Sequence, residues 1–310
     1  MILTVTPTPA IDVTYSVEGL QAGSQIRSQR VIKEASGKGV NVSAALAQLG
    51  YETRGVVAVS DDAVGHAWVE LADSLAFALD PVVVSAGTRL NTTVKDARGQ
   101  TTRVNEPVTP LHAGDVSALV AAVARALEAQ PATWVVCSGS LPPDSAGALV
   151  AGLSETARAH GARIAFDTSG AGLQAAAAEG VDLLKPNEEE LQALIGQPLT
   201  TRTAFEQATM TLARLIDGTV LTTLGADGAI ACDNTSIAHA HTPTRDVVNT
   251  AGAGDATLAG FLANDDADLQ TRVAAAVQWG LAACLHDGTV GLNAEAVHTL
   301  TMHHGRRDTP

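Results

Sequence analysis

Hydrophobic and polar positions along the chain follow two alternating patterns, short apolar runs and longer amphipathic segments. The short runs have the length and composition of buried strands and occupy residues 2–6, 56–59, 82–85, 133–137, 163–166, 182–184 and 220–223. The longer segments have helical spacing of their apolar positions and occupy residues 42–49, 63–76, 113–128, 145–160, 188–195, 203–216, 256–262 and 269–285. Strands followed by helices at this spacing predict a parallel, doubly wound α/β sheet with right-handed crossovers. Ligands of such sheets bind beyond the carboxyl ends of the strands.

Two stretches depart from this pattern. Residues 13–35 are polar and alternating, and residues 87–105 alternate on both sides of a turn at Gly99. Both predict short strands rather than helix, and the second predicts a hairpin. We therefore expect a small β excursion from the main sheet. The sequence contains neither an internal repeat nor a linker, so we expect a single domain over 1–310 that ends in a frayed polar tail, 302–310.

The composition narrows the classes of partner and compartment. The 310 residues are 46% hydrophobic but only 3% aromatic, so Ala, Val and Leu must fill the core. A formal net charge of −14 argues against nucleic acid or an anionic membrane surface as a partner. No apolar run is long enough to span a bilayer, and the first residues lack the basic region and cleavage site of a signal peptide. Cys137, Cys232 and Cys284 lack metal-site spacing, so we expect buried thiols in a reducing, cytoplasmic compartment.

Residues 247–257 are the strongest candidate for a catalytic centre. Gly252 and Gly254 allow a sharp backbone turn, and the apolar run after Asp255 predicts a helix. Amide groups at the start of a helix bind anions, and a carboxylate beside them can accept a proton from a hydroxyl. The alternative is a glycine-rich turn in which Asp255 only caps the helix, and the local sequence does not separate the two. The dinucleotide-binding glycine motif and the Walker A loop are both incomplete in the chain.

Two candidates for substrate binding follow earlier predicted strands. Asp12 could accept hydrogen bonds from the hydroxyls of a polyol, although an ordinary turn residue is the commoner case. Residues 36–41 (Ser-Gly-Lys-Gly-Val-Asn) combine glycines, which let backbone approach a ligand, with the charge of Lys38 and the amide of Asn41. The alternative for this stretch is an ordinary loop and helix cap.

A third candidate is the segment 185–190 (Lys-Pro-Asn-Glu-Glu-Glu). Lys185 can meet a phosphate, and Asn187 with Glu190 can hold a hydrated Mg²⁺ ion. Asn187 could equally cap the helix 188–195, with the acidic residues favouring its N-terminus. The local sequence leaves both interpretations open.

Five segments match motifs of one family in the order in which that family carries them. They are residues 36–41, 138–143 (Ser-Gly-Ser-Leu-Pro-Pro), 185–190, 223–228 (Thr-Leu-Gly-Ala-Asp-Gly) and 249–255 (Asn-Thr-Ala-Gly-Ala-Gly-Asp). On these motifs the chain resembles the ribokinase-like (PfkB) sugar kinases over essentially its whole length.

The resemblance implies a fold and a set of roles. The fold is a ribokinase-like, doubly wound, mostly parallel sheet with helices on both faces and a small β-sheet lid formed by about 12–35 and 87–108. The residues implied in catalysis are the base Asp255 and the anion-hole residues Gly252, Ala253 and Gly254. Those implied in sugar-phosphate binding are Asp12, Arg27, Gly37, Lys38, Gly39, Asn41, Arg89, Arg103 and Ser138. Those implied in ATP binding are Lys185, Asn187, Thr223, Gly225 and Gly228, with Mg²⁺ held through water by Asn187 and Glu190.

Other residues resemble one branch of the family, the 1-phosphofructokinases and tagatose-6-phosphate kinases. These are Asn249, residues 105–107 (Asn-Glu-Pro) and residues 88–91 (Thr-Arg-Leu-Asn), in which Arg89 is implied to hold the substrate phosphate. The resemblance implies ATP-dependent phosphorylation of a hexose phosphate, first of all D-fructose 1-phosphate. Tagatose 6-phosphate and fructose 6-phosphate are the alternatives, and Arg103 favours the latter.

Two further classes stay open, a nucleoside kinase of the same fold and a catalytically inactive regulator that binds sugar phosphate. The expected partners are the small-molecule substrates and, from the resemblance, a second copy in a homodimer formed through the lid sheets. We expect neither nucleic acid nor membrane as a partner.

Overall fold

The structure is a computed structural model that describes the chain except for residues 244–246, 301–302 and 305–310. Most of the tail that the sequence predicts to be frayed therefore lies outside the described residues. A ten-stranded sheet runs through the molecule in the order β14-β13-β12-β11-β10-β9-β8-β1-β4-β5. Its parallel strands are β1 (Ile2–Thr6), β4 (Thr53–Ser60), β5 (Ala78–Val84), β8 (Trp134–Ser138), β9 (Arg163–Asp167), β10 (Leu183–Leu184) and β11 (Thr219–Thr223). Three antiparallel strands complete one edge, β12 (Ala229–Cys232), β13 (Ile237–His241) and β14 (His303–His304).

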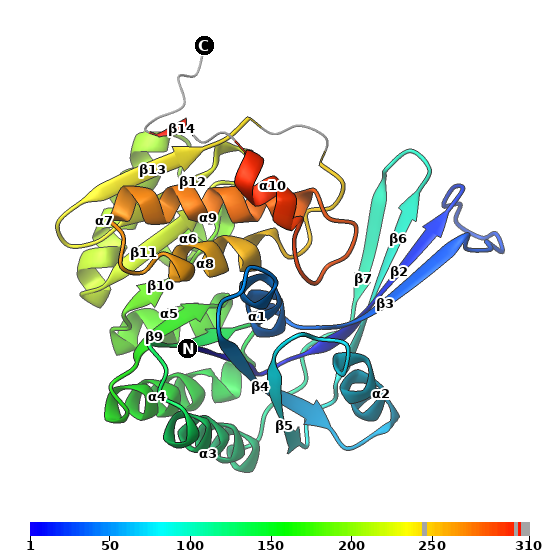
Figure 1. Ribbon diagram of the computed structural model, residues 1–310, viewed down its shortest axis with the longest axis horizontal. Helices are drawn as coiled ribbons and strands as arrows, with labels where there is room; N and C mark the ends of the chain where they lie inside the picture. Colours follow the sequence, from blue (N-terminus) through cyan, green and yellow to red (C-terminus); the bar gives the residue numbers. More distant parts are fainter. Residues whose placement is uncertain (244–246, 301–302, 305–310) are drawn as a thin grey trace.

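Helices cover both faces of this sheet (Figure 1). One layer contains α3 (Ala113–Ala129), α4 (Pro143–Ala159), α5 (Gly170–Glu179), α6 (Glu188–Ile195) and α7 (Arg202–Ile216). The other contains α1 (Lys38–Gln48), α8 (Ala253–Ala263), α9 (Leu269–Cys284) and α10 (Ala294–Thr299). Each helical layer forms a hydrophobic core with one face of the sheet. Successive residues of β1 point to opposite faces, so Leu3 packs in the core of the first layer and Ile2 in that of the second.

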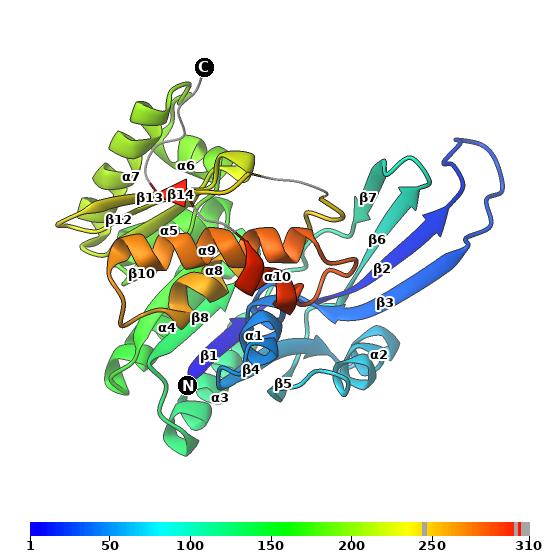
Figure 2. The ribbon, with the colours of Figure 1, turned by 45° about the horizontal axis from the view of Figure 1, so that its top comes forward.

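A second, four-stranded sheet projects from one side of the molecule, away from the helical layers (Figure 2). Its order is β3-β2-β6-β7, with β2 and β6 parallel to each other. The strands are β2 (Ala10–Val17), β3 (Arg30–Ser36), β6 (Arg89–Asp96) and β7 (Thr101–Asn105). Helix α2 (Ala63–Ala72) supports its base, where the buried Trp68 indole donates to the carbonyls of Ala10 and Ser36. This sheet is called the lid below.

The predicted fold class is confirmed, and the structure adds elements that the apolar pattern does not predict. Helix α5 and strands β12 and β13 are short and rich in alanine, so their periodicity is weak. The predicted helix 42–49 begins at Lys38 instead, so residues 38–41 form its first turn rather than a loop. Among the described residues, no helix is both long and apolar enough to cross a bilayer.

Candidate active site

The site begins with a buried carboxylate at the carboxyl end of β9. Asp167 is fully buried, and its Oδ1 atom lies 3.1 Å from Lys38 Nζ and 3.3 Å from Lys185 Nζ. Burial alone raises the pKa of Asp167, but the charges of Lys185 and Lys38 outweigh it and hold the pKa below its ordinary value. Asp167 thereby joins a lysine from the first turn of α1 to a lysine that follows β10. The sequence did not single out Asp167.

Asp255 lies next to this cluster, in the first turn of α8. Its side chain is only 6% exposed, and its Oδ2 atom accepts a 2.8 Å hydrogen bond from Asn41 Nδ2. The N-cap residue of α8 is Gly252, and no side chain makes a capping hydrogen bond at this end of the helix. The interpretation of Asp255 as a helix cap is therefore wrong. Burial, together with the charge of Asp167, raises the pKa of Asp255 to about 7 against the opposing effect of Lys38.

The two glycines before Asp255 meet different surroundings. Gly252 has φ +76°, and a Cβ atom at this position would lie 2.4 Å from the carbonyl oxygen of Thr289. A Cβ atom on Gly254 would lie 3.4 Å from Lys185 Nζ, an ordinary contact distance. The amides of the first turn of α8 therefore begin beside a lysine ammonium, an arrangement suited to an anion.

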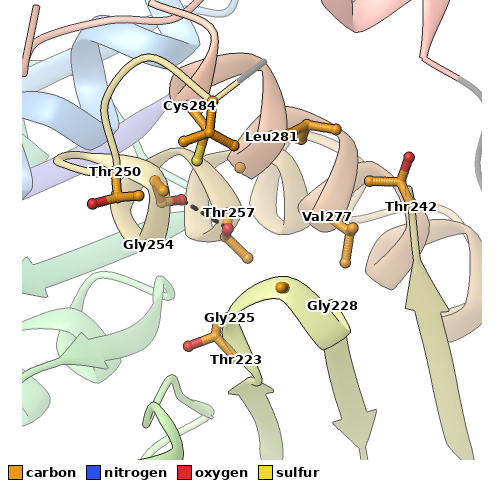
Figure 3. A pocket seen from close by; sticks show the side chains of 14 residues that line it. Thr223, Gly225, Gly228, Thr242, Thr250, Gly254, Thr257, Val277, Leu281 and Cys284 are labelled. Atoms are coloured by element: carbon orange, nitrogen blue, oxygen red, sulfur yellow. Dashed lines mark hydrogen bonds between the residues drawn. The ribbon is translucent and has the colours of Figure 1, made fainter. Parts of the chain in front are cut away.

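A cavity of about 350 Å³ lies against this turn, and Thr250, Ala253 and Gly254 form part of its lining. Figure 3 shows that the turn after β11 and helices α8 and α9 form its walls. Its wall residues include Thr223, Gly225, Gly228, Thr250, Gly254, Thr257, Val277, Leu281 and Cys284. Three residues expected to bind ATP thus line one cavity with Gly254 of the expected anion hole. The walls are largely apolar, as a nucleobase pocket requires.

Asn187 and Glu190 form a capping box at the start of α6. Asn187 Oδ1 accepts from the Glu190 amide at 2.9 Å, and Glu190 Oε2 accepts from the Asn187 amide at 2.8 Å. The helix-cap alternative therefore describes what both side chains do in this structure. Glu190 also contributes to raising the pKa of Lys38, which places its charge within reach of the site. No group of three or more His, Cys, Asp or Glu side chains suited to a metal occurs in the described part of the chain.

The lid side carries a second set of polar residues. Asp12 on β2 accepts a 3.0 Å hydrogen bond from Asn91 Nδ2 on the neighbouring β6. Arg89 donates through Nη2 to the Thr8 carbonyl at 2.7 Å, while its buried Nε has no partner among the described residues. Burial lowers the pKa of Arg89 against the charges of Asp12 and Glu106. The Nε–H group of Arg89, on the same side of the site as Asp12, can therefore donate a hydrogen bond to a ligand.

The structure also places the other residues that were expected to bind the sugar phosphate. Arg27, in the loop between β2 and β3, and Arg103, on β7, are exposed, and neither side chain makes a hydrogen bond or ion pair with described residues. Gly37 and Gly39 pack against the end of β1, where added Cβ atoms would lie 2.5 and 2.4 Å from Thr6 side-chain atoms. This close packing of α1 on β1 explains why both positions require glycine. Ser138 lies beside Asp167 in the register of β8 and β9, and its buried hydroxyl has no partner in the described structure.

Asp167 and Asn91 are the residues at this site that the sequence did not assign. Asp167 directly follows the predicted strand 163–166, at the end of the strand where ligands bind. That position could have marked it. Its pairing with Lys38 could not be read from the sequence, because the two residues are 129 positions apart along the chain.

Comparison with known proteins identifies the family to which these features belong. A model of the pfkB family of carbohydrate kinases matches residues 4–295. The chain belongs to this family, and the predicted sugar-kinase class is confirmed.

Individual relatives agree with this assignment. The chain is 38% identical over 268 residues to a 1-phosphofructokinase of Haloferax volcanii, covering 85% of this chain and 83% of the relative. It is 36% identical over 269 residues to a 1-phosphofructokinase of Rhodobacter capsulatus, covering 84% and 82%. The structure of phosphofructokinase-2 from Escherichia coli in complex with potassium superposes with a TM-score of 0.87 at 27% identity, covering 96% and 97% of the two chains.

Proposed function

We propose that the protein transfers the γ-phosphoryl group of ATP to O6 of D-fructose 1-phosphate, forming fructose 1,6-bisphosphate. The observation that carries the proposal is the buried Asp255, whose pKa is raised to about 7. A carboxylate with this pKa is half ionised near neutral pH and can accept the proton of an attacking hydroxyl. It follows directly on Gly254, which lines the cavity, and the relatives named 1-phosphofructokinase support the choice of sugar.

The reaction is an in-line transfer with little covalent chemistry for the protein to perform. Asp255 accepts the hydroxyl proton, and Asn41 holds its carboxylate in place. The amides at the start of α8 and the Lys185 ammonium stabilise charge on the transferred phosphoryl oxygens. Asp167 holds the Lys185 and Lys38 ammonium groups at one point, so neither has to be ordered during the reaction.

The side-chain oxygens of Asp167, Asn187 and Glu190 are of the kind that a magnesium ion carried by the nucleotide prefers. Asp167 Oδ2 is buried without a partner among the described residues. Asn187 and Glu190 would hold the hydrated ion from the start of α6. When bound, Mg²⁺ supplies neutralisation of the nucleotide phosphates.

Sugar binding is assigned to the lid side of the site. Asp12 and the Ser138 hydroxyl offer hydrogen bonds to sugar hydroxyls, and Arg89 offers its Nε–H group to the phosphate; within the described part of the chain, neither the hydroxyl nor this Nε has a partner. Lys38, in the first turn of α1, is assigned to the substrate as well, beside its ion pair with Asp167. A kinase for fructose 6-phosphate or tagatose 6-phosphate is the second candidate, and the exposed Arg103 on β7 favours fructose 6-phosphate.

The deciding experiment measures kcat/KM for fructose 1-phosphate, fructose 6-phosphate and tagatose 6-phosphate under one set of conditions. We expect fructose 1-phosphate to be preferred. A preference above about tenfold for either 6-phosphate, equal to about 1.4 kcal/mol of transition-state binding, overturns the substrate and leaves a sugar kinase. Turnover of a nucleoside alone, or no ATP turnover at all, would instead point to one of the two other classes.

We also propose that two copies assemble through their lids. Val31, Leu90 and Val104 leave apolar side chains 43%, 38% and 65% exposed on the lid. A pairing of two lids would cover such residues. Light scattering should give twice the chain mass, and Val104→Asp should reduce it to one. A cytoplasmic location is proposed because Cys137, Cys232 and Cys284 are free.

A further inference from the structure

One lid residue is hydrogen-bonded to the loop between α9 and α10. Glu34 lies on β3, and its carboxylate accepts hydrogen bonds from the amides of Thr289 at 3.0 Å and Val290 at 3.4 Å. The same carboxylate fills the space beside Gly288, where an added Cβ atom would lie 2.5 Å from Glu34 Oε1. A single lid side chain thereby holds residues 288–290 through two charge-assisted hydrogen bonds.

The opposite side of this loop contacts the segment that opens α8. Asn249 Nδ2 donates to the carbonyl oxygens of Gly288 at 3.1 Å and Asp287 at 3.4 Å. Its Oδ1 atom accepts from the Ala251 amide at 3.0 Å, one residue before Gly252. Gly252 itself lies against the Thr289 carbonyl oxygen. The loop thus offers its amides to the lid and its carbonyls to the expected anion hole.

Two basic lid residues reinforce the same connection less strongly. Lys95 on β6 donates to the Val248 carbonyl at 3.1 Å and lies 3.8 Å from Asp287. Arg30 on β3 lies 3.6 Å from Asp287. The Asp287 pairs are exposed to solvent and therefore weak. Glu34, whose contacts are partly buried, is the main link.

We propose that Glu34 is a positioning residue that couples sugar binding under the lid to nucleotide binding at the start of α8. The strand β3 that carries Glu34 runs directly into Gly37 and α1, which holds Lys38 and Asn41. A sugar phosphate that fixes the lid therefore fixes residues 288–290 and, through Asn249, the turn at Gly252. This inference rests on the proposed function, because it takes the lid side as the sugar site. The coupling is reciprocal by thermodynamic necessity.

The test measures the affinity for the Mg²⁺ complex of a non-hydrolysable ATP analogue, with and without saturating fructose 1-phosphate. In the wild-type protein the sugar phosphate should tighten analogue binding by about fivefold or more. Glu34→Gln should bring this ratio close to one and lower kcat, while the Kd for fructose 1-phosphate alone changes by less than about twofold. The matched control is Glu18→Gln, because Glu18 is exposed at the end of β2 and its carboxylate contacts only the Gln29 side chain among the described residues. The control should keep the wild-type ratio.

The outcomes separate this inference from the proposed substrate. Wild-type coupling in a folded Glu34→Gln protein, or an equal loss of affinity for both ligands, overturns the role of Glu34. If Glu34→Gln is not recovered folded, Glu34→Asp keeps the charge with a shorter reach and should show a reduced ratio. If the wild-type protein does not bind fructose 1-phosphate, the substrate assignment fails instead. The same titration is then run with the hexose phosphate that the enzyme turns over.

Discussion

Replacing Asp167 with asparagine should move the pH dependence of the reaction. Asp167 is fully buried, and its charge is one of the causes that raise the pKa of Asp255 to about 7. A base must be ionised to act, so kcat/KM of the wild-type enzyme should fall as the pH drops through about 7. In Asp167→Asn the like charge is gone, and Lys38 and Lys185 act on Asp255 alone. The acid limb should therefore shift to lower pH by at least about one unit, or about 1.4 kcal/mol.

The assay is kcat/KM for the sugar phosphate from pH 5 to 9, which reports ionisations of the free enzyme and free substrate. The second ionisation of a phosphate ester, near pH 6, is common to both proteins and cancels in the comparison. The plateau of the variant should be lower by about ten- to a hundredfold, because two ammonium groups lose a charge-assisted partner. Asp182→Asn is the control, since the Asp182 carboxylate lies outside the site and, among the described residues, accepts only from the Ile164 amide. An acid limb that stays in place or rises in Asp167→Asn refutes the electrostatic account of Asp255.

Two further variants test the sugar side and the turn before α8. Arg89→Ala should raise KM for the sugar phosphate by about ten- to a hundredfold and leave KM for ATP nearly unchanged, since one charge-assisted contact is worth about 1.5–3 kcal/mol. Equal effects on both substrates would indicate general damage. Gly252→Ala should lower the free energy of unfolding by at least about 1–2 kcal/mol in urea titrations, because φ is +76° and the Thr289 carbonyl lies 2.4 Å from the new Cβ. Gly254→Ala, with no such clash, should cost less, and equal losses would contradict this reading of the turn.

The sequence predicted the parallel sheet and the residues before α8 because both leave local signals. Strand-length apolar runs mark the buried strands, and the glycines at 252 and 254 mark a tight turn before a helix. The direction of the Asp255 side chain is not a local property. It depends on Asn41, which is distant in sequence and reaches Asp255 only because α1 and α8 pack on the same face of the sheet.

Contacts between distant segments also explain what the sequence did not reveal. The ion pairs of Asp167 arise where the ends of β9 and β10 meet the start of α1, and the hydrogen bonds of Glu34 join lid and loop across most of the chain. Helix α1 begins at Lys38, directly after Gly37 packs on Thr6. The spacing of apolar residues along the sequence does not reveal this contact. The short strand β12 (Ala-Ile-Ala-Cys) is placed by pairing with β11 rather than by its own pattern.

The most direct test of the central claim is the turnover of Asp255→Asn. Asparagine preserves the size of the side chain but cannot take the proton of the sugar hydroxyl. We predict that kcat falls by about two to four orders of magnitude, while the Kd values for fructose 1-phosphate and the ATP analogue stay within a few-fold of wild type. A purified, folded variant that keeps a tenth of wild-type kcat would show that Asp255 is not the base and would contradict the account.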